Sequence, residues 1–375
     1  MRNKREYYVF LGSTNYFMEK VTNFGDAVKH AQSFVELVKK SDASRERKMP
    51  FDEQADCLIV ANNHYHSIVE TAHDRLGSLI EEISTEDALI FIHNPTRVLW
   101  EYLLRQQESE EIILHCEPEK YKMDRDTKSF SHNILKISEN IIGQDNAVHE
   151  VSKSMWYLTR AERKNPYVIM LYGNSGLGKT ELVREIADKF YFSHYFEKHL
   201  SMFMNNTYSD YFFGEKPNRR SLGFELLERE SNLIFLDEID KCPAHFYSAF
   251  YTLFDNVLFK DATYDVDITG LLIILTSNFH NHEEMKKELG LPIFYRIDKF
   301  LKFDDFSQNI IMEITKKEVN IRKNEYSPHI TSDEIYYEAS KLIQTQGENA
   351  RTIKYKVQEV IENMLFEEVV GNADV

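Results

Sequence analysis

The chain reads Gly173-Asn174-Ser175-Gly176-Leu177-Gly178-Lys179-Thr180 directly after the apolar run Tyr167–Tyr172. This spacing is that of a phosphate-binding loop, G-x-x-x-x-G-K-[ST]. Its glycines allow the backbone to curl so that successive N–H groups point at phosphate oxygens, and the helix expected over Glu181–Phe190 adds its positive N-terminal end. In such a loop Lys179 reaches the β- and γ-phosphates and the Thr180 hydroxyl ligates magnesium. We therefore assign all eight residues to nucleotide binding, and Thr180 also to the metal.

Composition limits the class of protein. The chain has 375 residues, enough for two or three domains, and its 42% hydrophobic and 28% charged residues are typical of a globular protein. A net charge of −16 argues against broad, sequence-independent nucleic-acid binding, although it leaves room for a local basic patch. The three cysteines fit a reducing compartment, and no apolar stretch is long enough for a signal peptide or a membrane span. We expect a cytoplasmic protein with no membrane contact.

The first part of the chain, residues 1–118, alternates strands with helices. Short apolar strands are expected over Tyr7–Leu11, Cys57–Ala61, Ala88–Ile92 and Ile112–His115, and helices over Asp26–Lys39, Ser67–Ile83 and Thr96–Gln106, with a charged loop over Ser41–Asp52. This alternation predicts an α/β domain with a mostly parallel sheet. We interpret it as a domain that binds a partner or a ligand.

The remaining residues divide into three segments. Residues 119–134 contain many charges and few apolar side chains, which indicates a linker. Residues 135–303 hold the phosphate loop and form a second α/β domain. Residues 304–375 predict helices over Phe306–Lys323, Ser332–Gln346 and Ala350–Val369, with Ser332 and Asp333 capping the second of them.

Two further strands of the second domain end in polar residues. The apolar run Asn232–Leu236 ends in Asp237 and Glu238, of which the first suits magnesium and the second suits the orientation or deprotonation of an attacking water. The run Leu271–Leu275 leads to Asn278, whose amide can hydrogen-bond the γ-phosphate or that water.

The order of these segments resembles the AAA+ ATPases, and among them the Clp-type disaggregase and unfoldase modules. The resemblance covers about residues 139–367. It is carried by five short segments. Ile141–Val148 precedes the phosphate loop, and Asp237–Lys241, Thr276–Asn278, Phe294–Asp298 and Asn349–Arg351 follow it in this order. It implies an AAA+ nucleotide-binding α/β domain followed by a helical lid, Mg²⁺-dependent hydrolysis of ATP, and assembly into a ring, with a hexamer as the family precedent.

The resemblance also implies residue roles. Ile141 and Ile142 match the segment that packs on adenine, and Asn278 matches the first sensor. Arg296 matches the arginine finger that reaches a neighbouring subunit's nucleotide, and Arg351 matches the second sensor, on the lid. Simpler alternatives stand beside the two arginines. Arg296 could form a local ion pair with Asp298, and Arg351 could lie on a solvated helix face, since Asn349 stands where the family often has Gly.

The substrate-gripping segment departs from the family pattern. Either Phe212-Phe213-Gly214 supplies an aromatic grip, or Asn218-Arg219-Arg220 forms a shorter, basic tip. The segment Leu258–Asp267, where the family places a second pore loop, lacks that loop's glycines. Such trimming is similar to that of torsin-type ATPases, which work without threading.

The first domain offers histidines at three expected strand ends, namely His64, His93 and His115. Ligands of parallel sheets bind beyond the carboxyl ends of the strands, so these side chains predict a crevice for a small molecule or metal, unless they are ordinary polar loop starts.

Three functions follow for the chain. The leading one is an ATP-driven ring that remodels a protein bound through its first domain. The alternative is a nucleotide-controlled scaffold or switch that presents this domain to an effector, and a nucleic-acid motor comes last.

Overall fold

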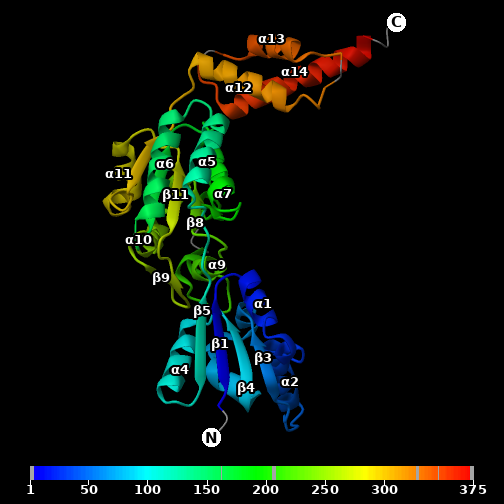
Figure 1. Ribbon diagram of the computed structural model, residues 1–375, viewed down its shortest axis with the longest axis vertical. Helices are drawn as coiled ribbons and strands as arrows, with labels where there is room; N and C mark the ends of the chain where they lie inside the picture. The colour runs from blue at the N-terminus through cyan, green and yellow to red at the C-terminus, as the bar shows by residue number, and fades with distance from the viewer. Residues whose placement is uncertain (1–3, 162, 205–207, 327–328, 345, 372–375) are drawn as a thin grey trace.

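The computed structural model describes residues 4–161, 163–204, 208–326, 329–344 and 346–371. It has three parts arranged along one long axis, with the N-terminal sheet at one end, a second sheet in the middle and a group of helices at the other end (Figure 1). The two sheets are parallel throughout, which confirms the α/β class expected from the sequence. Within the described residues, no helix is both long and apolar enough to cross a bilayer.

The N-terminal part contains β1 (Glu6–Leu11), α1 (Thr14–Thr22), β2 (Gln32–Ser33), α2 (Phe34–Glu46), β3 (Ala55–Val60), α3 (Leu76–Glu82), β4 (Ser84–His93), α4 (Arg97–Glu108) and β5 (Ile113–Pro118). Its five strands lie in the order β2-β3-β4-β1-β5. Alternate residues of each strand face opposite sides. On one side Phe10 and Phe91 pack on α1, and on the other side Val9 and Ile90 pack on α2, α3 and α4.

The middle part contains α5 (Thr127–Asn140), α6 (Asp145–Arg160), β6 (Tyr167–Tyr172), α7 (Lys179–Phe190), β7 (Phe196–His199), α8 (Ser209–Phe213), α9 (Leu222–Leu227), β8 (Leu233–Asp237), α10 (Tyr247–Asp255), β9 (Leu258–Lys260), β10 (Asp265–Asp267), β11 (Leu272–Ser277), α11 (His282–Phe294) and β12 (Lys299–Lys302). The strand order is β12-β6-β11-β8-β7, with the antiparallel hairpin β9–β10 apart from the sheet. The sheet is covered by α5, α6 and α7 on one side and by α8 to α11 on the other. Its strands are nearly continuous apolar runs because both of its faces are buried.

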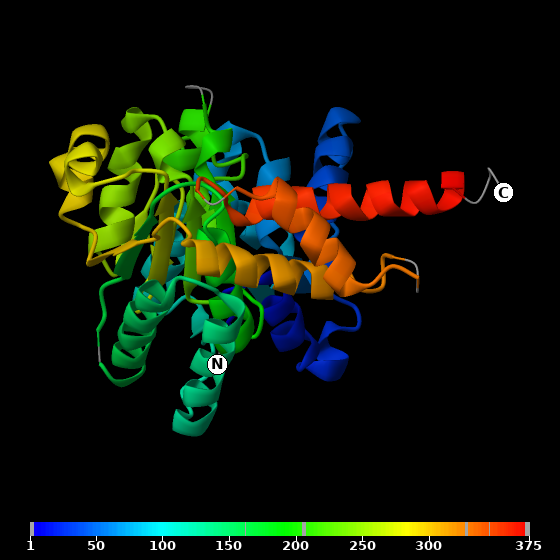
Figure 2. The same cartoon turned by 90° about the horizontal axis from the view of Figure 1, so that it is seen from above.

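The C-terminal helices are α12 (Gln308–Ile321), α13 (Ser332–Leu342) and α14 (Ala350–Gly371), which pack on one another and project sideways when the molecule is seen from above (Figure 2). Their boundaries lie within a few residues of those expected. The cap of α13 is an exception: Thr331, and not Ser332 or Asp333, accepts from the Glu334 N–H, and the Glu334 carboxylate accepts from Thr331 in return. This is a capping box, in which side chain and backbone satisfy each other.

Three expectations for the first third of the chain are wrong. The segment Asp26–Lys39 is not one helix, because Gln32 and Ser33 form a short strand and α2 begins only at Phe34. That helix continues to Glu46, so the first half of the expected loop over Ser41–Asp52 is helical. Two short 3₁₀ turns over Asn62–Ser67 and Glu70–Arg75 precede α3, and these break the helix expected over Ser67–Ile83.

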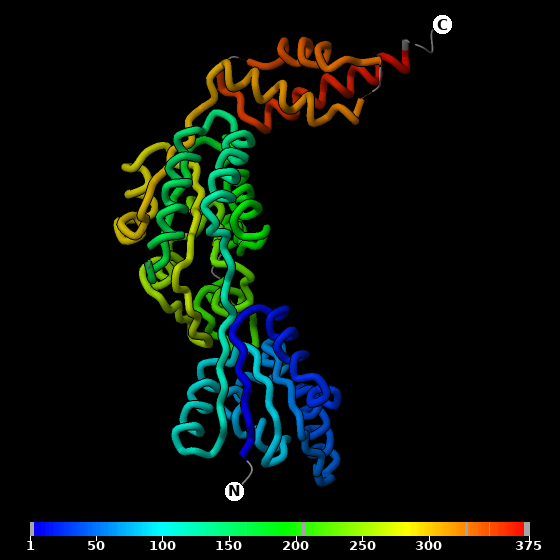
Figure 3. Tube along the Cα trace, in the orientation of Figure 1, coloured from blue at the N-terminus to red at the C-terminus, as the bar shows by residue number. Residues whose placement is uncertain are grey.

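The linker expected over residues 119–134 is also shorter than predicted. Asp126 caps α5 at Thr127, and Phe130 and Ile137 of that helix are buried in the core beneath the second sheet. The extended connection is therefore limited to residues 119–126, which run along the junction of the two α/β parts (Figure 3).

Those two parts are joined by direct contacts as well. The Arg97 N–H, at the start of α4, donates to the Thr263 carbonyl in the turn of the β9–β10 hairpin at 2.8 Å. The Arg97 guanidinium adds bonds to the Asp265 carboxylate at 2.8 Å and to the Asp261 carbonyl at 2.5 Å. The hairpin that occupies the expected second pore segment is thus held by the N-terminal domain.

Candidate nucleotide site

The phosphate-loop segment joins β6 to α7 at the carboxyl end of the second sheet. Gly173, Gly176 and Gly178 all have positive φ angles, of 132°, 77° and 98°. These conformations favour glycine because a Cβ atom would clash with the backbone. At Gly178 no atom beyond its two chain neighbours lies within 4 Å of the position a Cβ would take, so the loop faces open space there. The loop therefore has the cradle shape that phosphate oxygens require.

Lys179 lies at the centre of this cradle with only 8% of its surface exposed. Its Nζ donates to the Gly173 carbonyl at 2.6 Å, to the Asn174 carbonyl at 2.8 Å and to the Asn278 Oδ1 at 3.3 Å. Burial lowers the pKa of Lys179 to about 8, because the ammonium loses hydration that these neutral oxygens replace only in part. The ammonium is held where an anion would restore its charge balance.

The acidic end of β8 faces the same space. Thr276 at the end of β11 donates its hydroxyl to Asp237 and accepts the Glu238 N–H at 3.0 Å, which ties the two strand ends together. Glu238 has a left-handed backbone with φ 58°, an uncommon conformation for a non-glycine residue that is often found at functional sites. His199, at the end of β7, lies 3.1 Å from Asp237.

These side chains line one cavity of about 320 Å³. Its lining includes the predicted residues Ser175, Gly176, Gly178, Lys179, Thr180, Asp237, Glu238, Asn278 and Arg351. The lining also includes Arg184 and His199, which sequence reasoning missed. Arg184 stands one helical turn after Thr180, a spacing that could have identified it. His199 ends a strand whose sequence, Phe196-Glu197-Lys198-His199, has no apolar run to reveal it.

A second cavity of about 360 Å³ adjoins the first and shares Gly178, Glu181, Ala350 and Arg351 with it. Ile141, Ile142 and Leu177 line this second cavity, together with Ile314 and Ile321 of α12. A polar cavity beside an apolar one suits a ligand with a charged end and a flat apolar end. The residues expected at the phosphates and at the base thus lie in adjacent spaces.

Helix α14 contacts the phosphate loop through the residues at its N-terminus. The Ala350 N–H donates to the Gly176 carbonyl at 2.9 Å. Asn349 caps α14, since its Oδ1 accepts from the Arg351 and Thr352 N–H groups at 2.9 and 3.0 Å. This cap gives Asn at position 349 a structural role. Arg351 lines both cavities, but its side chain is exposed, so the second-sensor role and the solvated-face alternative both stay predictions.

Arg296 lines neither cavity. Its guanidinium donates to Asp255 at 2.5 Å and to the Pro292 carbonyl at 2.7 Å, and lies 4.7 Å from the centre of the Tyr251 ring. The alternative pair with Asp298 does not form, because Asp298 binds Arg163 at 2.9 Å instead. Arg296 is thus held on the surface of α10 and α11, away from the nucleotide space of its own chain.

The aromatic alternative for the gripping loop is wrong. Phe212 is 1% exposed and stacks on Phe246 with ring centres 4.4 Å apart, so it belongs to the core. Arg219 is exposed, but it shares Asp210 with Lys216 at 3.1 and 2.9 Å, which offsets part of the basic charge of the other alternative. Arg220 faces the N-terminal domain instead, in a third cavity.

Only two of the three predicted histidines of the N-terminal domain line the same cavity. His64 and His93 line that third cavity, whereas His115 stacks on Tyr8 and borders a different space. The reason is the strand order, because β5 pairs with β1 on the side away from β4. Among the residues that the structure describes, no group of three or more His, Cys, Asp or Glu side chains is placed to hold a metal ion.

Comparison with known proteins identifies relatives of the middle part. Residues 169–304 match the family described as ATPase family associated with various cellular activities (AAA). The chain is 25% identical over 291 residues to the negative regulator of genetic competence ClpC/MecB of Bacillus subtilis, covering 64% of this chain and 35% of that protein. It is 24% identical over 234 residues to the human mitochondrial disaggregase, covering 54% and 32%.

The fold is also found in a solved structure, the S. cerevisiae Hsp104–ADP complex. The TM-score is 0.50 at 19% identity, over 66% of this chain and 49% of that one. The chain spans about a third of the length of the curated relatives that it matches.

Proposed function

The chain contains an AAA+ module of the Clp-type disaggregase class, and from this premise we propose that it binds and hydrolyses ATP with Mg²⁺ and works as a ring that remodels a protein partner. The observation that carries the proposal is the cavity where Lys179, Asp237, Glu238 and Arg351 converge. Bound Mg²⁺ would polarise the terminal phosphate and neutralise charge that develops there.

The residues of the chain divide the remaining work. Lys179 and the loop N–H groups bind phosphate oxygens, and Thr180 and Asp237 hold the metal. Glu238 accepts a proton from the attacking water, and Asn278, already 3.3 Å from Lys179, orients that water. Ile141 and Ile142 contact the base.

The two arginines differ in reach. Arg351 lies on the lid beside the phosphate cavity and acts on the nucleotide of its own subunit. Arg296 lies away from that cavity, so in this proposal it completes the site of a neighbouring subunit after exchanging Asp255 for phosphate. Ring assembly would then be a condition for full activity.

A second function has its own support. The hairpin β9–β10 is bound by Arg97, and Phe212 is buried, so neither aromatic grip nor free second loop is present among the described residues. These contacts favour a nucleotide-controlled scaffold or switch that presents the N-terminal domain to an effector, without threading.

The first test is the solution mass of the Glu238→Gln variant with and without ATP and Mg²⁺. This change should permit binding and block hydrolysis, so a shift from small species to a discrete ring near six subunits is expected. A monomer at every ATP concentration would contradict the assignment of Arg296 to a neighbouring site. If a ring forms, the ATPase rate of the wild-type protein is measured with and without casein. A faster rate with casein would favour remodelling, and an unchanged rate would favour the switch.

A further inference from the structure

A cavity of about 530 Å³ lies between the N-terminal domain and α9. On the N-terminal side its lining includes Thr14 after β1, Ala61 after β3 and His93 at the end of β4, all at the carboxyl ends of these parallel strands. The neighbours β4 and β1 continue in opposite directions, since β1 leads to α1 on one face and β4 leads to α4 on the other. Such a switch point opens a crevice in which parallel sheets bind ligands.

The walls of the cavity combine apolar surface with a few polar groups. Phe17 and Ile59 of the N-terminal domain face Phe224 of α9, and His64 and Arg220 line the same space. A volume of a few hundred cubic ångströms with this mixture is typical of small-molecule sites, where apolar walls supply affinity and polar groups fix orientation.

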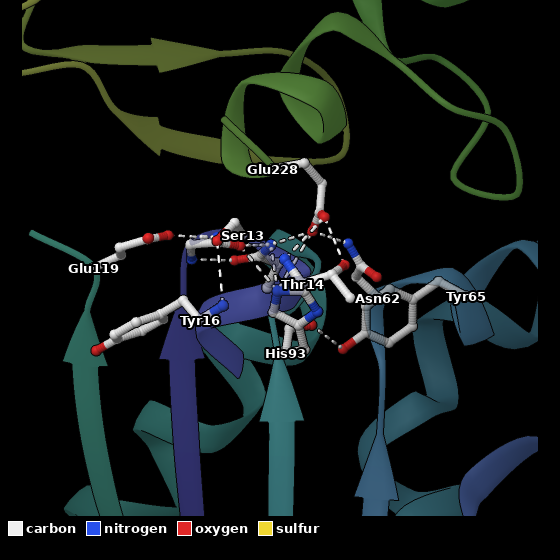
Figure 4. A network of polar contacts seen from close by, with 10 residues as sticks. Ser13, Thr14, Tyr16, Asn62, Tyr65, His93, Glu119 and Glu228 are labelled. Atoms are coloured by element: carbon white, nitrogen blue, oxygen red, sulfur yellow. Dashed lines mark hydrogen bonds and ion pairs between the residues drawn. The ribbon is translucent and has the colours of Figure 1, made fainter. Parts of the chain in front are cut away.

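At the cavity, the N-terminal domain holds one carboxylate, that of Glu228, in a network of polar contacts (Figure 4). The Thr14 N–H and hydroxyl donate to one carboxylate oxygen of Glu228 at 3.1 and 2.7 Å. The side-chain amides of Asn62 and Asn94 donate to the other oxygen, the latter at 3.1 Å. All four donors belong to the N-terminal domain, and Thr14 also begins helix α1, whose positive end faces the carboxylate.

The carboxylate in this position comes from another domain. Glu228 lies between α9 and β8, and it reaches the donors across a sequence separation of 214 residues from Thr14. His93, which is 1% exposed and lies 3.4 Å from Glu228, does not supply a permanent positive charge, because burial lowers its pKa to about 4. The anion is therefore held by neutral donors, an arrangement that a carboxylate or a phosphate satisfies equally.

Arg220 provides the cation that is otherwise missing. Among the described residues, no carboxylate lies within ion-pair distance of its guanidinium, which rests 5.6 Å from the centre of the Phe224 ring. An unpaired guanidinium beside apolar walls favours an incoming anion with a flat body.

From these contacts we propose that the N-terminal crevice binds a small molecule with a carboxylate or phosphate on an apolar body. Its anion takes the position of the Glu228 carboxylate on Thr14, Asn62 and Asn94, and its body fills the space between Phe17 and Phe224. Glu228 is then the internal occupant that the ligand displaces.

Glu228, the residue that the ligand would displace, is connected to the nucleotide site through strand β8. Glu228 precedes β8, and the same strand ends in Asp237, which Glu238 follows directly. Ligand binding would free the segment before β8 from the N-terminal domain, so this part of the inference rests on the proposed ATPase function.

The test uses nucleotide-free full-length protein and follows the Thr14 amide by NMR. The probes are benzoate and phenyl phosphate, with benzamide as a neutral control. In the Glu228→Gln variant the competing charge is gone, so we expect benzoate or phenyl phosphate to saturate the Thr14 shift at a concentration about tenfold lower than in wild type. Adding Arg220→Gln to this variant should weaken binding about threefold to tenfold.

Glu230→Gln is the matched control, because Glu230 is close in sequence but binds Asn15 outside the cavity. It should bind the probes as wild type does. A folded Glu228→Gln protein in which neither anion shifts Thr14 saturably, or in which benzamide does so equally, overturns the proposal. A response to only one of the two anions identifies the preferred group.

The result is independent of ATP hydrolysis. The Thr14 shift is measured without nucleotide, and repeating it with Lys179→Ala removes phenyl phosphate bound at the phosphate loop. A protein that fails to hydrolyse ATP can still pass this test, and an active ATPase can fail it.

Discussion

The two parallel sheets of this chain each end in a polar crevice, but the two crevices are filled in opposite ways. In the second sheet the ammonium of Lys179 is held by carbonyl oxygens, and the glycine-rich loop faces an open cavity. In the N-terminal sheet the donors already hold the carboxylate of Glu228. The same strand topology thus places a crevice at each sheet, and the N-terminal crevice differs because Glu228 of the middle part occupies its donors.

The largest expected effect concerns the open crevice. Replacing Glu238 by Gln removes the carboxylate that we propose as the base, so we expect ATP hydrolysis to fall by about 10²- to 10⁴-fold while ATP still binds. Phosphate release and nucleotide binding are measured on the same sample. Glu283→Gln, on the exposed start of α11, serves as control and should keep its rate. Equal loss in both variants would remove Glu238 from the chemistry.

A smaller effect is expected at the junction that closes the other crevice. Arg97→Ala removes the charged bonds to Asp265 and to the Asp261 carbonyl, and we expect urea denaturation to show a loss of about 1–3 kcal/mol. The affinity for ATP should not change, because Arg97 is remote from the nucleotide cavity. Arg105→Ala, on the exposed side of the same helix, is the matched control. If Arg105→Ala costs as much as Arg97→Ala, the hairpin contact does not stabilise the junction.

The smallest effect is a pH dependence that distinguishes the crevices. Free Lys179, with its pKa lowered to about 8, loses its proton as the pH rises through that value. ATP binding above pH 8 must then take up a proton, so affinity should fall by up to about tenfold per pH unit, and Lys179→Arg should flatten the profile. His93, with its pKa lowered to about 4, stays neutral between pH 7 and 9. Its charge therefore does not change over this range, and we expect the affinity of the probes at Thr14 to stay constant. Titration calorimetry and NMR check the two curves.

Local spacing explains what could be predicted. The phosphate loop, the acidic end of β8 and the lid helices are each encoded within a short segment, and the structure brings Lys179, Asp237, Glu238, Asn278 and Arg351 to one cavity. The assigned roles stay predictions, as does the action of Arg296 on a neighbouring subunit.

What could not be predicted depends on contacts between distant segments. No periodic pattern reveals that β5 pairs beyond β1, which separates His115 from His64 and His93. The sequence around Phe212 does not tell a substrate-gripping side chain from a core side chain. The stacking of Phe212 on Phe246 in the structure assigns it to the core. The pairing of Glu228 with Thr14 joins two domains, and neither residue belongs to a recognisable motif.

The contact between the lid and the phosphate loop makes Gly176 vulnerable in an unexpected way. A Cβ atom at this position would lie 2.7 Å from the Asn349 side chain and would also strain a left-handed backbone. A substitution at Gly176 would therefore push the lid away from the loop even if phosphate still fitted. If the proposed nucleotide site is real, such a variant would separate phosphate binding from the position of α14, which are otherwise linked at one residue.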